Sequence, residues 1–213
     1  MANYKKGVAM RKYILREARK TFNRRDLQVT LGELARELHI SNGRITNYFP
    51  TKDHLFAALS KDYDTRFADV ITSFPISSPL SLAQLAKLFG AVMDLQHEFR
   101  STIIFVCSTH PSQQVLHRQV STSYSINRQQ VKVMVDALVD AGLLTSDIQE
   151  PEEFEIFSFQ HVNLFTTWVV SLSVYYYARS YRKMKPVYLR GILMCYYPYL
   201  TAAGRAQLKS LQL

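Results

Sequence analysis

The sequence is poor in the residues that interrupt helices and in those that form covalent or metal cross-links. Its 213 residues include only seven Gly, seven Pro and two Cys. So few turn-forming residues favour long helices over a fold of many short strands. Cys107 and Cys195 provide neither a disulfide framework nor the spacing of a metal site, which is the usage expected in a reducing cytoplasm.

Long apolar segments are missing too. The N-terminal residues lack the uninterrupted apolar core of a secretory signal peptide. The longest apolar run, residues 165–178, is interrupted by Thr and Ser and is too short to span a bilayer comfortably. We therefore expect a cytoplasmic protein that is neither exported nor inserted into a membrane.

The sequence also lacks the local patterns that accompany catalysis. It contains no P-loop, dinucleotide-binding fingerprint or nucleophile elbow. The six histidines show no metal-ligand spacing beyond His110 and His117, which flank a turn that contains proline. The acidic run at residues 150–155 is typical of a helix N-terminus. We predict no enzymatic activity, no metal and no cofactor.

What the sequence does contain is an asymmetric distribution of charge. Up to and including Lys52 there are 12 Lys and Arg against four Asp and Glu, a balance of +8 within a net charge of +9. A basic segment on a nearly neutral remainder is the electrostatic footprint of a nucleic-acid-binding module, because phosphate neutralisation releases counterions.

Much of this charge belongs to a first helix predicted at residues 8–24, which follows a short basic arm at residues 1–7. Seven cations are expected on or just past its solvent side: Arg11, Lys12, Arg16, Arg19, Lys20, Arg24 and Arg25. A basic amphipathic helix on a membrane surface is the lesser alternative, because packing on the next two helices explains the apolar face better.

Residues 30–49 have the pattern of a helix-turn-helix. Leu31, Leu34 and Leu38 follow the i, i+3, i+7 spacing of an amphipathic helix. Thr30 and Glu33 fit a capping box, in which each side chain accepts a hydrogen bond from the other residue's backbone amide. A turn follows, and a second short helix is expected after it.

The second helix of this motif begins after Ser41, a suitable N-cap, and ends before Pro50. Ile45 and Phe49 are four residues apart and are expected to face the core, with Tyr48 at their edge. The opposite face carries small, polar or cationic residues: Asn42, Gly43, Arg44, Thr46 and Asn47. Because Arg pairs bidentately with guanine and Asn with adenine, this face has the chemistry of a helix that reads the major groove.

These residues resemble the TetR (tetracycline-repressor-like) family of regulators. The family pattern, T-x-x-x-[IL]-A-x-x-x-x-[VI]-S-x-G-x-[IL]-Y-x-[YH]-F-x-[ST]-K-x-x-L, is matched in one register by Thr30, Leu34, Ala35, Ile40, Ser41, Gly43, Ile45, Tyr48, Phe49, Thr51, Lys52 and Leu55. The chain departs from it at Thr46, where the family usually has tyrosine, and at Asp26, where glycine is usual. The resemblance covers roughly the first quarter of the chain.

The resemblance implies a DNA-binding role for nine residues. Bases or the adjacent backbone are the expected targets of Arg44 and Asn47, with Asn42 and Thr46 in secondary positions. Phosphate contacts are expected from Thr30, Ser41, Gly43, Tyr48 and Lys52. Lys52 stands at the start of the next helix, where an ammonium group and exposed amides can act together on a phosphate.

The remaining sequence indicates helices only, so the predicted fold class is all-α. We place a three-helix DNA-binding domain at residues 1–52, joined by a fourth helix to a larger effector-binding and dimerisation domain at residues 53–213. The segment at residues 74–79, rich in Pro and Ser, should end the fourth helix. Later helices are predicted at about residues 82–99, 112–141, 151–179, 186–197 and 201–211, with residues 102–107 ambiguous between helix and strand.

Two local features of these later helices are specific. Gly142 followed by Leu143 fits a Schellman ending for the helix at residues 112–141. The helix at residues 151–179 begins with acidic residues and is predicted to end with Arg179, Arg182, Lys183 and Lys185, which would suit the helix dipole. Its middle is apolar on more than one face, so it should be buried on two sides.

The resemblance also implies a homodimer, formed through the helices at about residues 151–179 and 186–200 as a four-helix bundle. A two-fold axis would let two reading helices recognise a palindromic operator in double-stranded DNA. The alternative is that these helices fill the core of a monomer.

An effector pocket in the larger domain is the family's usual design. The residues we expect to line it are Phe89, Met93, Phe105, Met134, Trp168 and Tyr176, and for each of them the alternative is a place in the core. An apolar lining would favour a hydrophobic or aromatic effector held by a few polar anchors.

The interpretation is a sequence-specific transcriptional regulator, a ligand-responsive repressor. Two other classes stay open. A helical small-molecule-binding protein or enzyme with a vestigial DNA-binding domain would bind or turn over a ligand without salt-dependent binding to DNA. An adaptor that uses the basic domain on acidic protein partners would be distinguished by competition with random DNA fragments.

Overall fold

Helices make up most of the chain described by the computed structural model, which covers residues 2–74, 79–108, 110, 114–176 and 179–212, with the backbone alone at 2–5 and 114–121. Within these ranges the only strand-like pairing is an isolated antiparallel bridge between Leu144 and Leu200. The predicted all-α class is confirmed. The described residues include no helix that is both long and apolar enough to cross a membrane.

The chain divides into two compact units. The first unit consists of Met1–Thr65 and Glu98–Val120, and the second consists of Arg66–His97 and Ser121–Leu213. The first unit therefore extends beyond residues 1–52 and takes in a segment from the middle of the sequence.

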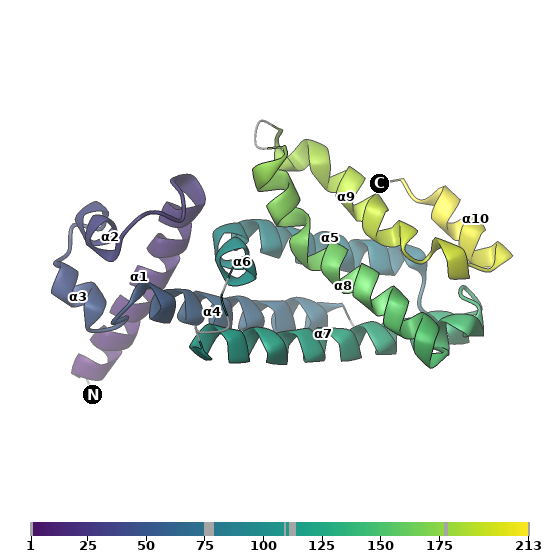
Figure 1. Ribbon diagram of the computed structural model, residues 1–213, viewed down its shortest axis with the longest axis horizontal. Coiled ribbons are helices and arrows are strands. Elements are labelled where there is room, and N and C mark those ends of the chain that lie inside the picture. Colours follow the sequence, from purple (N-terminus) through teal and green to yellow (C-terminus); the bar gives the residue numbers. More distant parts are fainter. Residues whose placement is uncertain (1, 75–78, 109, 111–113, 177–178, 213) are drawn as a thin grey trace. The chain divides into compact units, whose positions relative to one another are not determined.

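The first unit is built on one apolar cluster. Its helices are α1 (Ala2–Arg24), α2 (Leu31–Glu37), α3 (Asn42–Thr46), the first part of α4 (Lys52–Ser73) and α6 (Arg100–Cys107) (Figure 1). The buried members of the cluster are Ile14, Leu15, Ala18, Phe22, Val29, Leu34, Ala35, Ile45, Phe49, Leu55, Phe56 and Leu59. They recur at the helical spacing of three or four residues, so each helix buries one face.

The first helix starts earlier than predicted. Residues 2–7 belong to α1, so the expected basic arm at residues 1–7 is wrong over this range. None of the residues at 2–6 stops a helix, and Gly7 alone costs only about 1 kcal/mol relative to Ala in a helix interior. A helix that is already anchored by Ile14 and Phe22 therefore continues through it.

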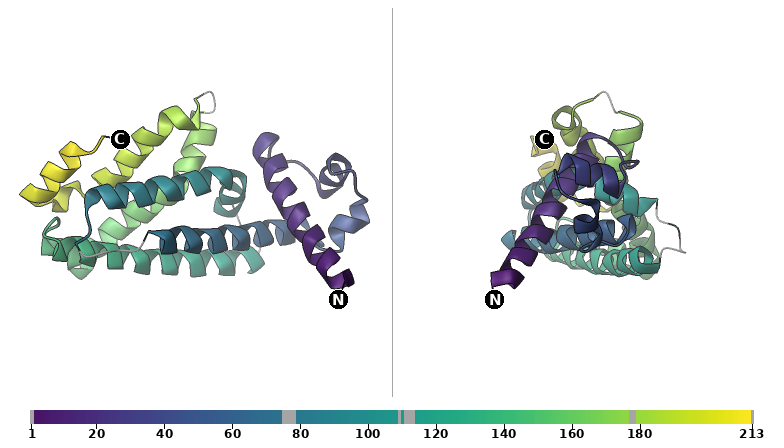
Figure 2. Two further views of the ribbon diagram at one scale, coloured as in Figure 1. Left: turned by 180° about the vertical axis from the view of Figure 1, so that it is seen from behind. Right: turned by 90° about the vertical axis from the view of Figure 1, so that its left-hand side faces the viewer.

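The second unit contains the rest of α4, α5 (Leu82–Glu98) up to His97, and α7 (Gln114–Asp140) from Ser121. It also contains α8 (Pro151–Val174), α9 (Tyr181–Met194), α10 (Ala202–Ser210) and the 3₁₀ turns η1 (Ser146–Gln149) and η2 (Tyr197–Tyr199). Figure 2 shows α8 and α9 as neighbouring helices that run in opposite directions. Both α8 and α9 bury an apolar face within this unit.

The Schellman ending of α7 is confirmed. Gly142 has a φ of +69°, in the left-handed region that favours glycine. Its amide donates to the Val139 carbonyl at 2.8 Å, and the Leu143 amide donates to the Leu138 carbonyl at 3.0 Å. These two bonds satisfy carbonyls that the helix end would otherwise leave without partners.

Several element boundaries differ from the prediction. The ambiguous stretch at residues 102–107 is helical and lies in α6, whereas residues 75–78 of the predicted boundary segment lie outside the described residues. The helix predicted to reach residue 179 ends at Val174, and the next helix begins at Tyr181 rather than at Pro186. A proline in the helix interior removes one backbone hydrogen bond, a loss that the buried apolar face of α9 offsets.

This shift corrects the prediction for the basic residues. Arg182, Lys183 and Lys185 stand in the first turns of α9, not at the end of α8. There they lie at the positive end of a helix dipole and cannot complement it. Lys185 instead pairs with Asp94 of α5, its Nζ atom 2.7 Å from Oδ1.

Two buried polar groups are fixed within the second unit. The Gln96 amide donates to the Phe165 carbonyl at 2.8 Å and accepts a bond from the Trp168 indole at 2.5 Å. His161 is fully buried, and its Nε2 atom lies 3.2 Å from the Tyr196 hydroxyl. Nδ1 of His161 has no partner among the described residues.

The surroundings of His161 keep its ring neutral. The rings of Phe89, Phe157 and Phe165 have their centroids 5.3, 5.5 and 5.7 Å from it. Burial among these apolar groups lowers the pKa of His161 from 6.5 to about 3, because the imidazolium would lose its hydration.

Acid should therefore destabilise the protein through His161. The unfolded chain takes up a proton on this residue below about pH 6.5, whereas the folded chain does not until about pH 3. The stability that it contributes is fully present above pH 6.5 and is lost as the pH falls, by up to about 1.4 kcal/mol per pH unit. We expect His161→Phe to have a shallower dependence of unfolding free energy on pH, measured by urea denaturation at about pH 7, 6 and 5. An unchanged slope would contradict this assignment.

Candidate DNA-binding site

The capping box at the start of α2 forms as predicted. The Glu33 amide donates to the Thr30 hydroxyl oxygen at 3.2 Å, and the Thr30 amide donates to Oε2 of Glu33 at 2.8 Å. The Thr30 hydroxyl also donates to the same carboxylate at 2.8 Å. A phosphate contact through this hydroxyl would therefore replace an existing bond.

The turn between α2 and α3 is tight and well defined. The Ile40 amide donates to the Ala35 carbonyl at 3.0 Å, and His39 between the two helices has a φ of +54°. A non-glycine residue in this region is uncommon and is maintained only by surrounding structure. Here Ile40 packs against the apolar cluster, which fixes the angle at which α3 leaves α2.

Helix α3 is held by one cap and two anchors. The Ser41 hydroxyl accepts a bond from the Arg44 amide at 3.2 Å, which confirms Ser41 as the N-cap. Ile45 is 0% and Phe49 is 1% exposed, and Tyr48 is half-buried beside them. A helix of five residues has little stability of its own, so these anchors determine its orientation.

The opposite face of α3 is available to a ligand. Asn42, Gly43, Arg44 and Asn47 are exposed, whereas Thr46 is half-buried and its hydroxyl donates to the Gly43 carbonyl at 3.3 Å. Nothing lies within 4 Å of the position that a Cβ atom at Gly43 would take, so the backbone can be closely approached here. The structure thus brings the expected reading residues together on one accessible surface.

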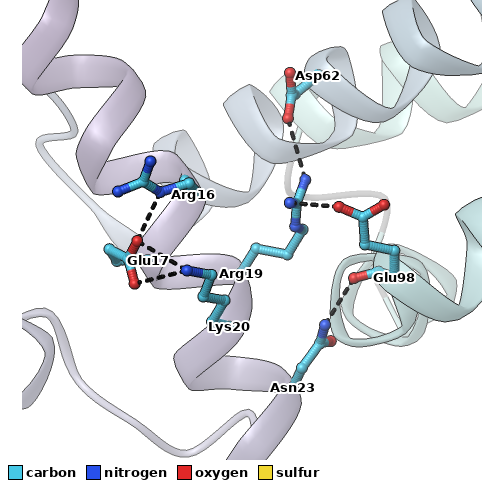
Figure 3. Close-up of polar contacts among 7 residues, drawn as sticks. All are labelled: Arg16, Glu17, Arg19, Lys20, Asn23, Asp62 and Glu98. Atoms are coloured by element: carbon cyan, nitrogen blue, oxygen red, sulfur yellow. Dashed lines mark hydrogen bonds and ion pairs between the residues drawn. The ribbon is translucent and has the colours of Figure 1, made fainter.

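Several of the predicted surface cations of α1 are neutralised by carboxylates. Arg16 and Lys20 contact Glu17, at 2.7 and 3.1 Å, as Figure 3 shows. Arg24 pairs with Glu37, and Arg25 lies 3.8 Å from Glu33 and from Glu37. The Thr21 hydroxyl and the neighbouring guanidinium groups lower the pKa of Glu37, which keeps it ionised.

Arg19 is not on the solvent side, which corrects the prediction for this residue. Its side chain is only 12% exposed, and its guanidinium lies 3.6 Å from Asp62 of α4 and 2.5 Å from Glu98 (Figure 3). The guanidinium also stacks 4.4 Å from the centre of the Phe99 ring. Arg19 therefore joins elements of the first unit.

Two cations remain close to the exposed face of α3. Arg44 is exposed and forms no ion pair with any described residue. The Arg11 guanidinium, also exposed, lies 5.1 Å from the centre of the Phe49 ring, which holds it near the end of the same helix. Sequence periodicity places Arg11 on α1 but carries no signal that it meets Phe49.

Lys52 has a structural partner. Its ammonium donates to the Leu27 carbonyl and lies 5.6 and 6.0 Å from the ring centres of Phe22 and Phe105. Partial burial lowers the pKa of Lys52. The side chain thus fastens the start of α4 to the loop before α2, and its contact with phosphate stays a prediction.

The segment that contains the helix-turn-helix matches one known protein family. Residues 14–59 match the family model described as "Bacterial regulatory proteins, tetR family". The chain carries a tetR-family DNA-binding domain. That domain spans the apolar anchors of α1, the whole helix-turn-helix and the first turns of α4.

Solved structures extend the likeness of fold beyond this tetR-family domain. A TetR-family transcriptional regulator from Marinobacter aquaeolei VT8 superposes with a TM-score of 0.74 at 19% identity, over 94% of this chain and 95% of that one. A candidate TetR-family regulator from Mesorhizobium loti MAFF303099 gives a TM-score of 0.61 at 12% identity, over 92% and 98%. No curated protein matches the sequence.

The residues expected to line an effector pocket lie in two places. Phe89, Met93, Met134 and Trp168 are buried in the second unit, and Tyr176 is exposed there. Phe105 belongs to the first unit, where its ring stacks on Phe56 of the tetR-family domain at 3.8 Å. The structure therefore does not bring Phe105 together with the others within one unit.

Loss of the Lys52 ammonium should destabilise the tetR-family domain. Lys52→Met keeps the apolar stem but removes the bond to the Leu27 carbonyl, so we expect a loss of about 1–2 kcal/mol of unfolding free energy. Lys61→Met, an exposed cation on the same helix, is the control and should change stability by less than about 0.5 kcal/mol. Urea denaturation measures both. Equal losses in the two variants would show that the Leu27 contact contributes nothing.

Proposed function

We propose that this protein is a homodimeric, ligand-responsive repressor that binds a palindromic operator through α3. The observation that carries the proposal is the exposed face of α3, with Arg44 and Asn47 turned outward by the buried anchors Ile45 and Phe49. A rigid helix with bidentate donors on one side is suited to reading base edges in the major groove.

The contacts to DNA divide into two kinds. Arg44 and Asn47 read bases or the adjacent backbone, and Asn42 and Thr46 act beside them. Phosphates are held by Thr30, Ser41, Gly43, Tyr48 and Lys52, which fix the register without reading sequence. The Ser41 hydroxyl accepts a bond from Arg44 but keeps its own proton for a phosphate oxygen.

The exposed faces of α8 and α9 support the homodimer. Ile156, Phe159 and Val174 of α8 are 48%, 62% and 58% exposed, although each is a large apolar side chain. Val187 and Met194 extend the same kind of surface along α9. Several exposed large apolar side chains on two neighbouring helices are typical of an interface.

The charges at the two ends of this surface favour one orientation of the second copy. Exposed Glu152 stands four residues before Ile156, and exposed Lys183 stands four residues before Val187, so each lies on the face of its apolar stripe. Because α8 and α9 run in opposite directions (Figure 2), the acidic start of α8 and the basic start of α9 stand at opposite ends of the helix pair. An antiparallel two-fold pairing places unlike ends together, whereas a parallel one places like ends together.

The effector would bind in the second unit. Phe89, Met93, Met134 and Trp168 offer apolar surface for a hydrophobic or aromatic molecule, and Tyr176 is the exposed member of the set. The effector would release DNA by binding more tightly to a state of the dimer that cannot reach both half-sites. The effector can shift the equilibrium between the two states by no more than the ratio of its affinities for them.

Selection of bound fragments from the host's genomic DNA tests the function directly. We expect enrichment of fragments that share a palindrome, with binding that weakens steeply as salt is raised. Half-sites should be about one helical turn apart or a multiple of it. Uniform recovery of all fragments would argue for non-specific electrostatic binding and against a regulator.

Arg44→Ala should reduce the preference for the selected sequence by a larger factor than it reduces the affinity for DNA in general. We expect the ratio of affinities for the selected duplex and a scrambled one to fall by the equivalent of about 1–3 kcal/mol for each half-site. Arg36→Ala, an exposed cation on α2, is the matched control and should weaken both duplexes alike. Fluorescence anisotropy titration measures both ratios. A preserved preference in Arg44→Ala would remove this residue from base reading.

Charge exchange tests the orientation of the dimer. In the antiparallel arrangement, Glu150→Lys with Glu152→Lys, or Arg182→Glu with Lys183→Glu, sets like charges against each other. We expect either variant alone to dimerise about tenfold more weakly at low salt, and an equimolar mixture to recover the wild-type affinity as a heterodimer. Sedimentation velocity measures this. A parallel dimer would tolerate each exchange alone.

A further inference from the structure

The N-terminal turns of α1 extend beyond the core of the first unit. Ile14, Ala18 and Phe22 are buried in the apolar cluster and follow one another at intervals of four residues. The same helical spacing, continued toward the N-terminus, places Arg11 and Gly7 on this face of α1. Figure 1 shows this part of the helix reaching past α3. A cation and a glycine therefore occupy the face that is apolar farther along α1.

This face of α1 meets the segment just past the end of α3. The Arg11 guanidinium lies 5.1 Å from the centre of the Phe49 ring, within the range of a cation–π contact. One turn earlier, a Cβ atom at Gly7 would lie 3.7 Å from the Tyr48 hydroxyl. Gly7 brings no side chain over this hydroxyl, which a larger residue would cover. The guanidinium and the hydroxyl thus both lie where α1 meets the end of α3.

The charge of Arg11 is not neutralised within the part of the protein that the structure describes. Arg16 and Arg24 share carboxylates, whereas Arg11 is exposed and has no ion pair among the described residues. A contact with an aromatic ring neutralises no charge and leaves N–H donors for an anion. The donors of Arg form a fork that matches two oxygens of a phosphate. Arg11 is therefore suited to bind a phosphate.

The position of Arg11 determines which phosphate it would meet. A helix that reads base edges lies in the major groove, which the phosphates of the two strands border. With Arg44 and Asn47 turned to the bases, the groups beside the end of α3 lie toward the edge of the groove. There the Arg11 guanidinium can bind the DNA backbone without displacing a reading residue.

We propose that Arg11 binds a backbone phosphate of the operator, beside the phosphate contact expected from Tyr48, and that the N-terminal part of α1 thus belongs to the DNA-binding surface. The proposal rests on the DNA-binding function given above. Arg11 contributes affinity and orientation rather than sequence preference, because phosphates are the same in every sequence. Its contact with Phe49 limits the conformations of the free side chain, which reduces the entropy lost on binding.

Paired charge removals in the full-length protein test the assignment. Arg11→Met keeps an apolar side chain over Phe49, and Lys12→Met removes an equal charge from an exposed position about 100° around the helix. Fluorescence anisotropy at several salt concentrations gives the affinities for the selected duplex and a scrambled one. We expect Arg11→Met to lower the salt exponent by about 0.9 for each protomer bound and to weaken both duplexes by similar factors, about tenfold at low salt. Lys12→Met should change the exponent by less than half as much.

A further variant separates charge from packing. Arg11→Lys keeps the positive charge, so its salt exponent should stay close to that of the wild type. In Arg11→Met the ratio of affinities for the selected and scrambled duplexes should be unchanged, because α3 keeps its orientation. Disruption of α3 would instead lower this ratio. Arg11→Gln takes the place of Arg11→Met if that variant does not fold.

The outcomes separate this inference from the proposed function. A wild-type salt exponent in Arg11→Met, or equal changes in Arg11→Met and Lys12→Met, would overturn the phosphate contact and leave DNA binding intact. A reduced preference for the selected duplex in Arg11→Met would assign Arg11 to the packing of α3 and overturn the contact as well. Absence of salt-dependent binding of the wild type to the duplex would overturn the proposed function, and the contact with it.

Discussion

The burial of Ile45 and Phe49 is the constraint on which the DNA-binding surface depends. Helix α3 has five residues, too few for a helix to persist in water without tertiary contacts. The two anchors insert into the cluster formed by α1, α2 and α4, and the Ser41 cap and the left-handed His39 fix the approach. Arg44 and Asn47 are exposed because the burial of Ile45 and Phe49 turns the other side of this segment to solvent.

The same cluster gives α6 its place in the first unit. Phe105 extends the cluster through Phe56, and Oδ1 of Asn23 in α1 accepts a bond from the Ser101 amide at the start of α6. In the second unit, two buried polar side chains have different environments. Gln96 is satisfied by Phe165 and Trp168, whereas His161 is held neutral among aromatic rings. Polar contacts thus fasten segments far apart in sequence in both units.

The features that could be predicted from the sequence are those formed by residues close together along the chain. The capping box of Thr30 and Glu33, the Ser41 cap and the Schellman ending at Gly142 involve bonds across at most five residues, so their signals are local. The inward positions of α3 follow from helical spacing in the same way. This covers most of the candidate site.

The predictions that were wrong or missing concern features determined by residues that are distant in the sequence. Arg19 was expected in solvent because periodicity cannot reveal that Glu98, far along the chain, lies beside it. Asn23 carries no local sign that it caps a helix 78 positions later. The boundary between α8 and α9 was misplaced because Pro186 usually marks a helix start, yet the buried face of α9 extends to Met184 before it.

The pairing of cations along α1 changes what the composition of the domain means for affinity. The balance of +8 counts all charges, but counterions leave the DNA only where cations of the protein neutralise its phosphates. Arg16, Lys20, Arg24 and Arg25 already share carboxylates, so they contribute a diffuse field more than discrete contacts. The number of counterions released on DNA binding should therefore depend on a small number of cationic side chains around α3 that have no carboxylate partner. A homologue with a lower formal charge but the same open set would bind DNA with a similar salt exponent.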